Sequence, residues 1–168
     1  MIGMGIGNSA GMVTAFLLAF LVCPLTAKPG AASDTRVPAE LRGTWSVDSV
    51  KVNGTGIAAY LPDDPAFVGQ TLRADAHALK MLDQTCEEPH LAREERPLAP
   101  LFQETFEAPP SDFRVELPDG PRPVFFVTCE RGGFGPAYDR GSWIAQVPEG
   151  RIAVNWFDSV LLFLQRNN

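Results

Sequence analysis

The sequence is poor in basic residues, cysteine and histidine. Its 168 residues hold 14 Lys+Arg against 20 Asp+Glu, which gives a formal net charge of −6. Because a nucleic-acid partner requires a basic surface to neutralise phosphates, this balance argues against one. The sequence also lacks the motifs of a nucleophile elbow, a phosphate-binding loop and a zinc protease. With 2 His and with 3 Cys that form no CxxC motif, we expect no metal site and no cofactor.

Long apolar runs are scarce too, and the longest one lies near the N-terminus. The run from Met12 to Val22 is uncharged and falls short of the ~20 residues that span a bilayer, but it has the length of a signal-peptide core. Residues 1–27 are therefore predicted to be a signal peptide, cleaved after Ala27 or alternatively after Ala32. The mature protein would be secreted or periplasmic, with no membrane span. Lipid attachment at Cys23 is the alternative location.

Removal of the signal peptide leaves two cysteines, Cys86 and Cys129. In an oxidising compartment an even pair separated by a long stretch of chain predicts a disulfide. The competing interpretation, a reduced thiol nucleophile with a histidine base, requires a cytosolic protein, and the leader argues against that location.

Residues 28–39 are small, polar and proline-containing and are expected to form a flexible linker, followed by a single β domain over 40–168. Alternating apolar residues and turn residues predict strands in that domain. The first strand is expected to be bent, with a bulge near Asp48 and Ser49. The expected strands are Leu41–Val52, Val68–Ala74, His77–Asp83, Phe113–Leu117, Val124–Cys129, Ser142–Val147, Arg151–Phe157 and Val160–Arg166.

Between Arg93 and Pro110 the apolar spacing changes from that of a strand to that of a helix. The residues on the predicted helical stripe are Leu98, Leu101, Phe102 and Phe106. Short turns between the later strands favour antiparallel pairing. The fold class is therefore mainly β: an eight-stranded antiparallel up-and-down barrel with one short helix, or alternatively a β-sandwich. The last strand is apolar on both faces, so we expect the helix to cover its outer face.

The triplet Gly43-Thr44-Trp45 opens the long bent strand, and Arg166 follows the last strand. This pattern resembles the calycins, which include lipocalins, fatty-acid-binding proteins and small bacterial protease inhibitors. The resemblance implies a calycin-like barrel in which Trp45 plugs the closed end and Arg166 packs across its ring, a contact of ~1 kcal/mol. The alternative is an ordinary core tryptophan in another small β domain.

Two long connections carry the candidate binding residues. The segment 53–69 contains Tyr60 and Phe67, and the segment 130–141 contains Arg131, Phe134, Tyr138 and Arg140. Long loops in compact domains are commonly functional, and aromatic and arginine side chains dominate binding surfaces. The alternative is that the four aromatic rings fold back under their own loops and that the two arginines bracket a turn.

These features predict a non-enzymatic binding protein with no catalytic residues. Its partner would be a protein, bound in an inhibitor-like way with Gly132–Pro136 inserted into a cleft. The alternative is a lipocalin-like carrier of a small apolar ligand. Large side chains expected to point inward favour protein binding, since they would fill so small a barrel; they are Phe113, Phe125, Trp143 and Trp156. A hydrolase using Asp/Glu is the third possibility, but Glu87-Glu88 and Glu94-Glu95 are expected in a polar loop around His90. A monomer is expected.

Overall fold

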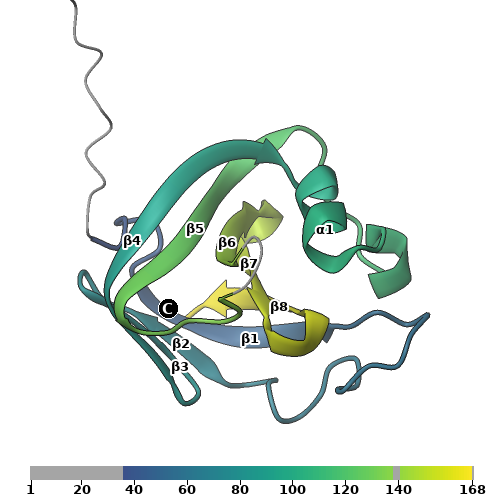
Figure 1. Ribbon diagram of the computed structural model, residues 1–168, viewed down its shortest axis with the longest axis horizontal. Helices are drawn as coiled ribbons and strands as arrows, with labels where there is room; N and C mark the ends of the chain where they lie inside the picture. Colours follow the sequence, from purple (N-terminus) through teal and green to yellow (C-terminus); the bar gives the residue numbers. More distant parts are fainter. Residues whose placement is uncertain (1–35, 138–140, 168) are drawn as a thin grey trace, which may run out of the picture. The chain divides into compact units, whose positions relative to one another are not determined.

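The computed structural model describes residues 36–137 and 141–167, which form a closed ring of eight antiparallel strands with one short α-helix (Figure 1). Each strand pairs with the next along the chain, and the eighth pairs with the first. The strands are β1 (Gly43–Lys51), β2 (Thr71–Ala74), β3 (Ala78–Met81), β4 (Gln84–Pro97), β5 (Pro121–Gly132), β6 (Ser142–Val147), β7 (Arg151–Trp156) and β8 (Val160–Arg166). The α-helix is α1 (Leu98–Phe106), and the 3-10 turns are η1 (Pro110–Phe113), η2 (Pro148–Gly150) and η3 (Phe157–Ser159).

The first strand bends where the sequence predicts it. Its register against β8 shifts between Val47 and Ser49, which leaves Asp48 as the extra residue of a bulge. The bulge lets both Val47 and Val50 point into the core, although their spacing breaks the two-residue period of a strand. The ring can therefore keep one continuous apolar interior past the bend.

Apolar side chains form two separate cores. The inner core fills the ring, and its larger members include Trp45, Leu72, Leu79, Met81, Phe125, Phe134, Ile152, Trp156, Leu162 and Leu164. The outer core lies between the ring and the helix, and it includes Leu98, Leu101, Phe102, Phe106, Phe113, Trp143, Leu161 and Phe163. Strand β8 supplies buried residues to both cores, which confirms that its outer face is covered.

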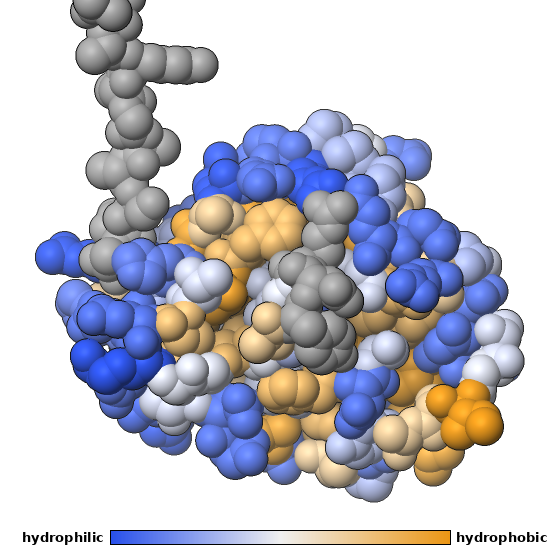
Figure 2. Space-filling model, viewed as in Figure 1, coloured by the Kyte–Doolittle hydropathy of each residue, from blue (hydrophilic) through white to orange (hydrophobic). Residues whose placement is uncertain are grey.

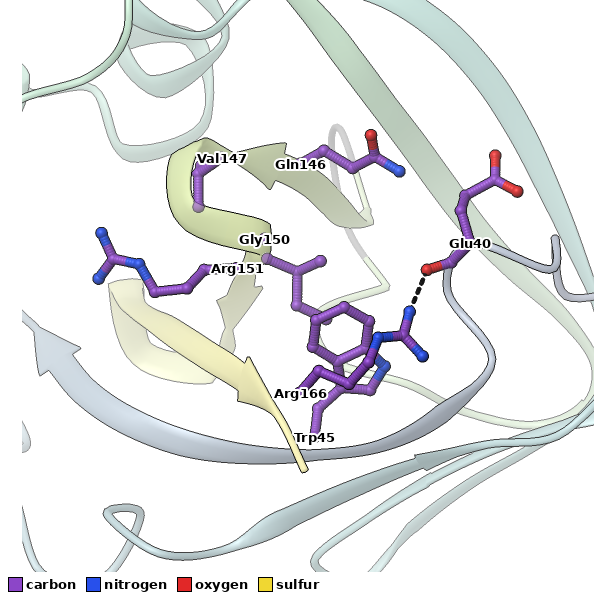
Figure 3. A pocket seen from close by; sticks show the side chains of 8 residues that line it. Glu40, Trp45, Gln146, Val147, Gly150, Arg151 and Arg166 are labelled. Atoms are coloured by element: carbon purple, nitrogen blue, oxygen red, sulfur yellow. Dashed lines mark hydrogen bonds between the residues drawn. The ribbon is translucent and has the colours of Figure 1, made fainter. Parts of the chain in front are cut away.

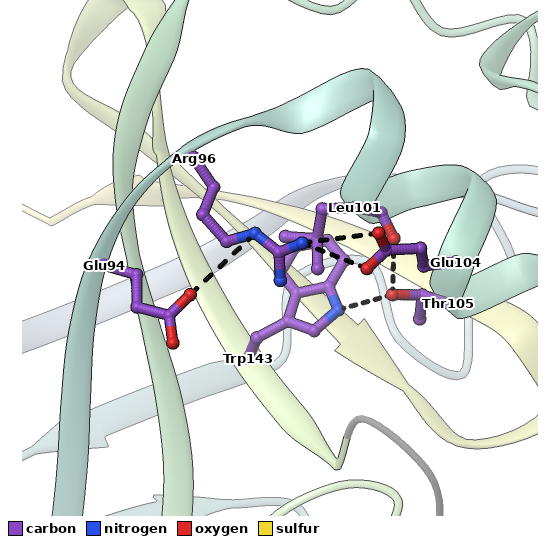
Figure 4. A network of polar contacts seen from close by, with 6 residues as sticks. All are labelled: Glu94, Arg96, Leu101, Glu104, Thr105 and Trp143. Atoms are coloured by element: carbon purple, nitrogen blue, oxygen red, sulfur yellow. Dashed lines mark hydrogen bonds and ion pairs between the residues drawn. The ribbon is translucent and has the colours of Figure 1, made fainter.

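The helix follows the predicted stripe, and polar contacts fix it at both of its edges (Figure 4). On the ring side, Trp143 Nε1 donates a hydrogen bond to Thr105 Oγ1 at 3.0 Å, and that hydroxyl donates to the Leu101 carbonyl at 2.8 Å. From β4, Arg96 lies 3.0 Å from a carboxylate oxygen of Glu104. Because a buried indole N–H needs an acceptor, the Thr105 contact determines how the helix sits on the ring.

The long strand β4 replaces the polar loop predicted around His90. Its carboxyl-terminal half is exposed on both faces, so it carries charged residues at successive positions and lacks the apolar alternation that identifies a strand. Ladder pairing with β5 extends from Cys86 to Pro97, whereas pairing with β3 ends at Glu87. In the described ranges, the rest of that second edge of β4 has no strand beside it.

The strand predicted over Phe113–Leu117 is also wrong. Residues 110–113 form the 3-10 turn η1, and Arg114 has a left-handed φ of 54° that ends any extended run. The alternating apolar residues there pack side by side under the helix and not across a sheet. Phe113 and Trp143, expected inside the ring, belong to the outer core, while Phe125 and Trp156 lie in the inner core as expected.

The segment predicted as a linker is packed against the domain where the structure describes it. Val37 is 0% exposed, and its N–H donates to the carbonyl of Ala76 at 3.0 Å. Residues 36–39, the described part of the predicted linker, therefore pack with the β domain. The predicted signal peptide, both cleavage positions and Cys23 lie outside the described residues. No helix within 36–137 and 141–167 is long and apolar enough to cross a membrane.

Candidate functional site

At one end of the ring the structure brings Trp45 and Arg166 together, as expected from the sequence. The guanidinium of Arg166 lies 4.2 Å from the centroid of the Trp45 ring, and its N–H groups donate to the carbonyls of Arg42 and Glu40. The indole N–H of Trp45 donates to the Leu41 carbonyl at 2.8 Å. Figure 3 shows this stack at the edge of a hollow of about 250 Å³ that Gln146 and Arg151 also line. The indole N–H of Trp45 and both terminal nitrogens of Arg166 are bonded to backbone carbonyls, so these groups are held by the protein itself.

Residues 130–137 lie at the opposite end, where the ring of Phe134 is 4% exposed and meets Trp156 edge to face at a centroid distance of 5.5 Å. The buried hydroxyl of Ser142 donates to the Phe134 carbonyl. Gly135 has a left-handed φ of 65°, and a Cβ there would lie 2.3 Å from Ser142 Oγ. The loop therefore packs onto the ring, and Gly132–Pro136 does not present the free segment expected of an inhibitor loop.

Two further candidates in this loop, Tyr138 and Arg140, lie outside the described residues. Arg131 is exposed and its Nε donates to a carboxylate oxygen of Glu87 at 2.9 Å. The hydrogen bond to Glu87 and the negative charge of that carboxylate raise the pKa of Arg131 above its ordinary value. Arg131 is committed to a cross-strand ion pair between β4 and β5.

The segment 53–69 is tied down at both of its stems. On the first side, Gly54 N–H donates to the Asp112 carbonyl at 2.8 Å, which joins the loop to η1. On the second side, two hydrogen bonds join Asp63 to Val50. The side-chain carboxylate of Asp63 accepts from the backbone N–H of Val50 at 2.9 Å, and the backbone N–H of Asp63 donates to the Val50 carbonyl at 3.0 Å. Phe67 is 4% exposed and meets Tyr60 at 4.8 Å. Phe67 therefore lies at the base of the loop, and the half-buried ring of Tyr60 packs against it.

Between these stems the loop presents an apolar tip, defined here as residues 57–61. Ile57 is 107% exposed and Leu61 is 68% exposed, and the two alanines between them are also exposed. Figure 2 shows orange apolar surface at the lower right, where Figure 1 draws the connection from β1 to β2. Single exposed apolar residues are normal, but several together on one anchored loop indicate a contact surface.

Sequence reasoning selected the aromatic residues of this loop and missed Ile57 and Leu61. Phe67 is buried and Tyr60 is half-buried, because the two large rings pack together against the inner core. One feature of the sequence does indicate the tip. Ile57 directly follows Gly54-Thr55-Gly56, in a stretch without the periodic apolar spacing that would predict a buried strand or helix.

The carboxylates considered for acid–base chemistry are surface groups of β4 with cationic or imidazole neighbours. Glu87 binds Arg131, Glu94 lies 3.8 Å from Arg96, and Glu95 lies 2.6 Å from Arg93. His77 Nδ1 lies 3.0 Å from Glu88 in the same exposed surroundings. Across the part of the chain that the structure describes, no three metal-ligating side chains come together. The geometry offers no enclosed acid–base pair.

The predicted disulfide is present: the Sγ atoms of Cys86 and Cys129 lie 2.03 Å apart, and the Cα atoms lie 5.2 Å apart. Cys86 is fully buried in the inner core, while Cys129 packs against that core from the neighbouring strand. The bond cross-links β4 and β5 close to the end of their ladder at which Cys86 pairs with Gly132.

Comparisons with family models, with curated proteins and with solved structures found no match, so the chain is assigned to no family.

Proposed function

We propose that this protein is a non-enzymatic, extracytoplasmic partner-binding module with a calycin-like barrel, and that it contacts a protein through the apolar tip, residues 57–61. The observation that carries the proposal is the exposure of Ile57 and Leu61 on a loop whose stems are hydrogen-bonded to the domain. An exposed apolar tip has a hydration cost that a soluble domain has no structural reason to retain.

The energetics support a binding role for the tip. Burying an Ile or Leu side chain against a partner contributes about 1.5–3 kcal/mol. Because Asp63 and Gly54 already fix the stems, the loop loses less conformational freedom on binding than a free loop would. The two aliphatic side chains together contribute about 3–6 kcal/mol, so they act as anchors of an interface to which the surface around the tip also contributes.

Two features support an extracytoplasmic location. The run from Met12 to Val22 has the length of a signal-peptide core, and the cysteine pair 86/129 is disulfide-bonded, which is typical of oxidising compartments. The carrier alternative has less support, because Trp45, Phe125 and Trp156 occupy the interior where a carrier would hold its ligand.

The test is affinity capture from an extract of the source cell envelope with two matched variants. Ile57→Asp places a charge in the tip. The control, Leu82→Asp, places the same charge outside the tip, at a leucine that is 44% exposed in the turn after β3. We expect a partner that the wild type and Leu82→Asp both retain and that Ile57→Asp binds at least thirtyfold more weakly, which corresponds to about 2 kcal/mol.

Equal retention by all three proteins, or retention by none, would overturn the proposal. Native mass spectrometry of the protein purified from its source supplies the complementary test. A stoichiometric small apolar molecule that stays bound to both variants would support the carrier alternative instead.

A further inference from the structure

Two positive charges face each other on the outer surface of the hairpin formed by β2 and β3. The register pairs Arg73 directly with Lys80, and both side chains are exposed. Their neighbours along each strand, such as Leu72 and Leu79, point into the inner core, so the alternation fixes both cations on the outside. Like charges directly opposite each other in an antiparallel pair destabilise it.

The sheet contains a second pair of opposed cations, Arg96 with Arg122, but carboxylates accompany that one. Glu94 and Glu104 lie 3.8 Å and 3.0 Å from Arg96. The corresponding pair across β4 and β5 is Glu87 with Arg131, which form an ion pair at 2.9 Å. Arg93 likewise lies 2.6 Å from Glu95. Within residues 36–137 and 141–167, neither Arg73 nor Lys80 has a carboxylate within ion-pair distance. A protein with a net charge of −6 thus leaves two adjacent cations without an acidic partner.

The two cations share a hollow whose lining contains no acid. It has a volume of about 220 Å³, and it is lined by Gln70, Thr71, Arg73, Lys80, Met81 and Leu82. Arg73 also lines a second hollow, of about 430 Å³, but the lining of that hollow includes the carboxylate of Asp75. The smaller hollow therefore combines two cations with hydroxyl and amide donors and keeps carboxylates out of its lining.

We propose that the outer face of the β2–β3 hairpin binds a tetrahedral oxyanion, a phosphate or sulfate group, between Arg73 and Lys80. A guanidinium supplies paired N–H donors and an ammonium supplies a compact charge, and both bind phosphate oxygens through charge-assisted hydrogen bonds. The hydroxyl of Thr71 and the amide of Gln70 lie in the same lining and can complete the donor set. The anion removes the repulsion between the cations, so binding and hairpin stability are linked. This site is independent of the apolar tip.

The test is an NMR titration of the wild type with sodium phosphate, with sodium chloride at matched ionic strength as the reference. We expect saturable shifts of the Arg73 side-chain N–H and of the backbone amides of β2 and β3 in phosphate alone. The double variant Arg73→Gln/Lys80→Gln loses the saturable shifts. Arg93→Gln is the matched control, because it removes an exposed strand cation from the same sheet, and it keeps them.

A second measurement separates a binding site from a general salt effect. In chloride, Lys80→Gln should unfold at a higher temperature than the wild type, because the like-charge pair is gone. In phosphate the order should reverse, since phosphate raises the midpoint of the wild type alone. Shifts that do not saturate, shifts that map to another surface, or equal phosphate responses of the wild type and the double variant would overturn the proposal.

Cosedimentation with phosphatidylcholine vesicles, with and without phosphatidic acid, identifies the source of the group. Binding to phosphatidic acid that the double variant loses indicates a lipid phosphate. Saturable binding of inorganic phosphate without cosedimentation indicates a free or soluble phosphate.

Discussion

Reduction of the disulfide between Cys86 and Cys129 should remove a large part of the stability of the domain. The bond joins residues 43 apart in sequence, and the chain-entropy relation for a loop of this length gives about 4 kcal/mol. The native state needs little rearrangement on reduction, because the ladder between β4 and β5 continues well beyond the cysteines to Pro97. The loss should therefore arise from the unfolded chain, which gains freedom when the cross-link is cut.

Urea unfolding, followed by tryptophan fluorescence, measures this loss. The oxidised wild type is compared with the same protein in excess dithiothreitol, so no side chain is replaced. Cys86→Ala/Cys129→Ala, measured with and without dithiothreitol, controls for effects of the reductant itself. Reduction should lower the free energy of unfolding by about 4 kcal/mol and raise the m-value, because the reduced chain exposes more surface when it unfolds.

Three results would refute this reasoning. A difference of less than about 1 kcal/mol between the oxidised and reduced wild type would show that the loop-closure estimate does not apply here. A response of Cys86→Ala/Cys129→Ala to dithiothreitol would assign the effect to another cause. Free thiols in the protein isolated from its source would remove the premise, because the bond would then not form in the cell.

Two further predictions concern the ends of the ring. Gly150 and Gly135 both have a left-handed φ, 69° and 65°, but a Cβ at Gly150 meets open space whereas one at Gly135 meets Ser142 Oγ at 2.3 Å. Gly150→Ala should cost about 1 kcal/mol and Gly135→Ala at least about 2 kcal/mol in urea unfolding, and equal costs would contradict the packing described for residues 130–141. Arg166→Ala removes both the stack on Trp45 and the bonds to two backbone carbonyls, so it should cost about 2–3 kcal/mol. Arg93→Ala, which breaks an exposed ion pair, should change stability by less than about 0.5 kcal/mol, and a similar loss in both variants would mean that Arg166 is not a structural residue.

The parts of the fold that the sequence predicts are those where side-chain polarity follows burial. Strands β2 and β3 alternate between polar outward and apolar buried positions, the stripe of α1 has a helical period, and β8 is apolar on both faces because it lies between two cores. In each case the side-chain pattern reflects a surface that is either buried or wet. Antiparallel order followed from the turns alone, since those turns are too short for crossovers.

The missed elements are those where burial gives no such contrast. The carboxyl-terminal half of β4 is exposed to solvent on both faces, so its amino-acid composition is that of a loop although it forms a strand. Around Phe113 the apolar residues alternate as they do in a strand, but Arg114 has a left-handed φ. Arginine rarely adopts that conformation, so the residue type gives no indication of it. Propensity arguments fail where tertiary packing decides the backbone conformation.

The apolar tip lies in one of the two connections that the sequence singles out, but its exposed residues are not the aromatic ones that the sequence favours. Composition identifies 53–69 as a long connection, but it cannot show which apolar side chains fold under the loop. Phe67 covers the inner core and Ile57 does not, because the two stems place the first next to the ring and the second at the far point of the turn. Similarly, the pairing of Arg73 with Lys80 requires the register of β2 and β3, which depends on the turn between them.

The unpaired edge of β4 has a consequence for how the protein behaves at high concentration. A strand edge without a neighbour is a template on which another chain can add a strand and begin a fibre. Along this edge two acidic residues, Glu94 and Glu95, lie between Arg93 and Arg96, and prolines at 89 and 97 bound the segment. A second copy in register would place like charges opposite each other and would meet prolines that lack an N–H donor. The charges and prolines that give β4 the composition of a loop are thus the residues that disfavour strand addition at that edge.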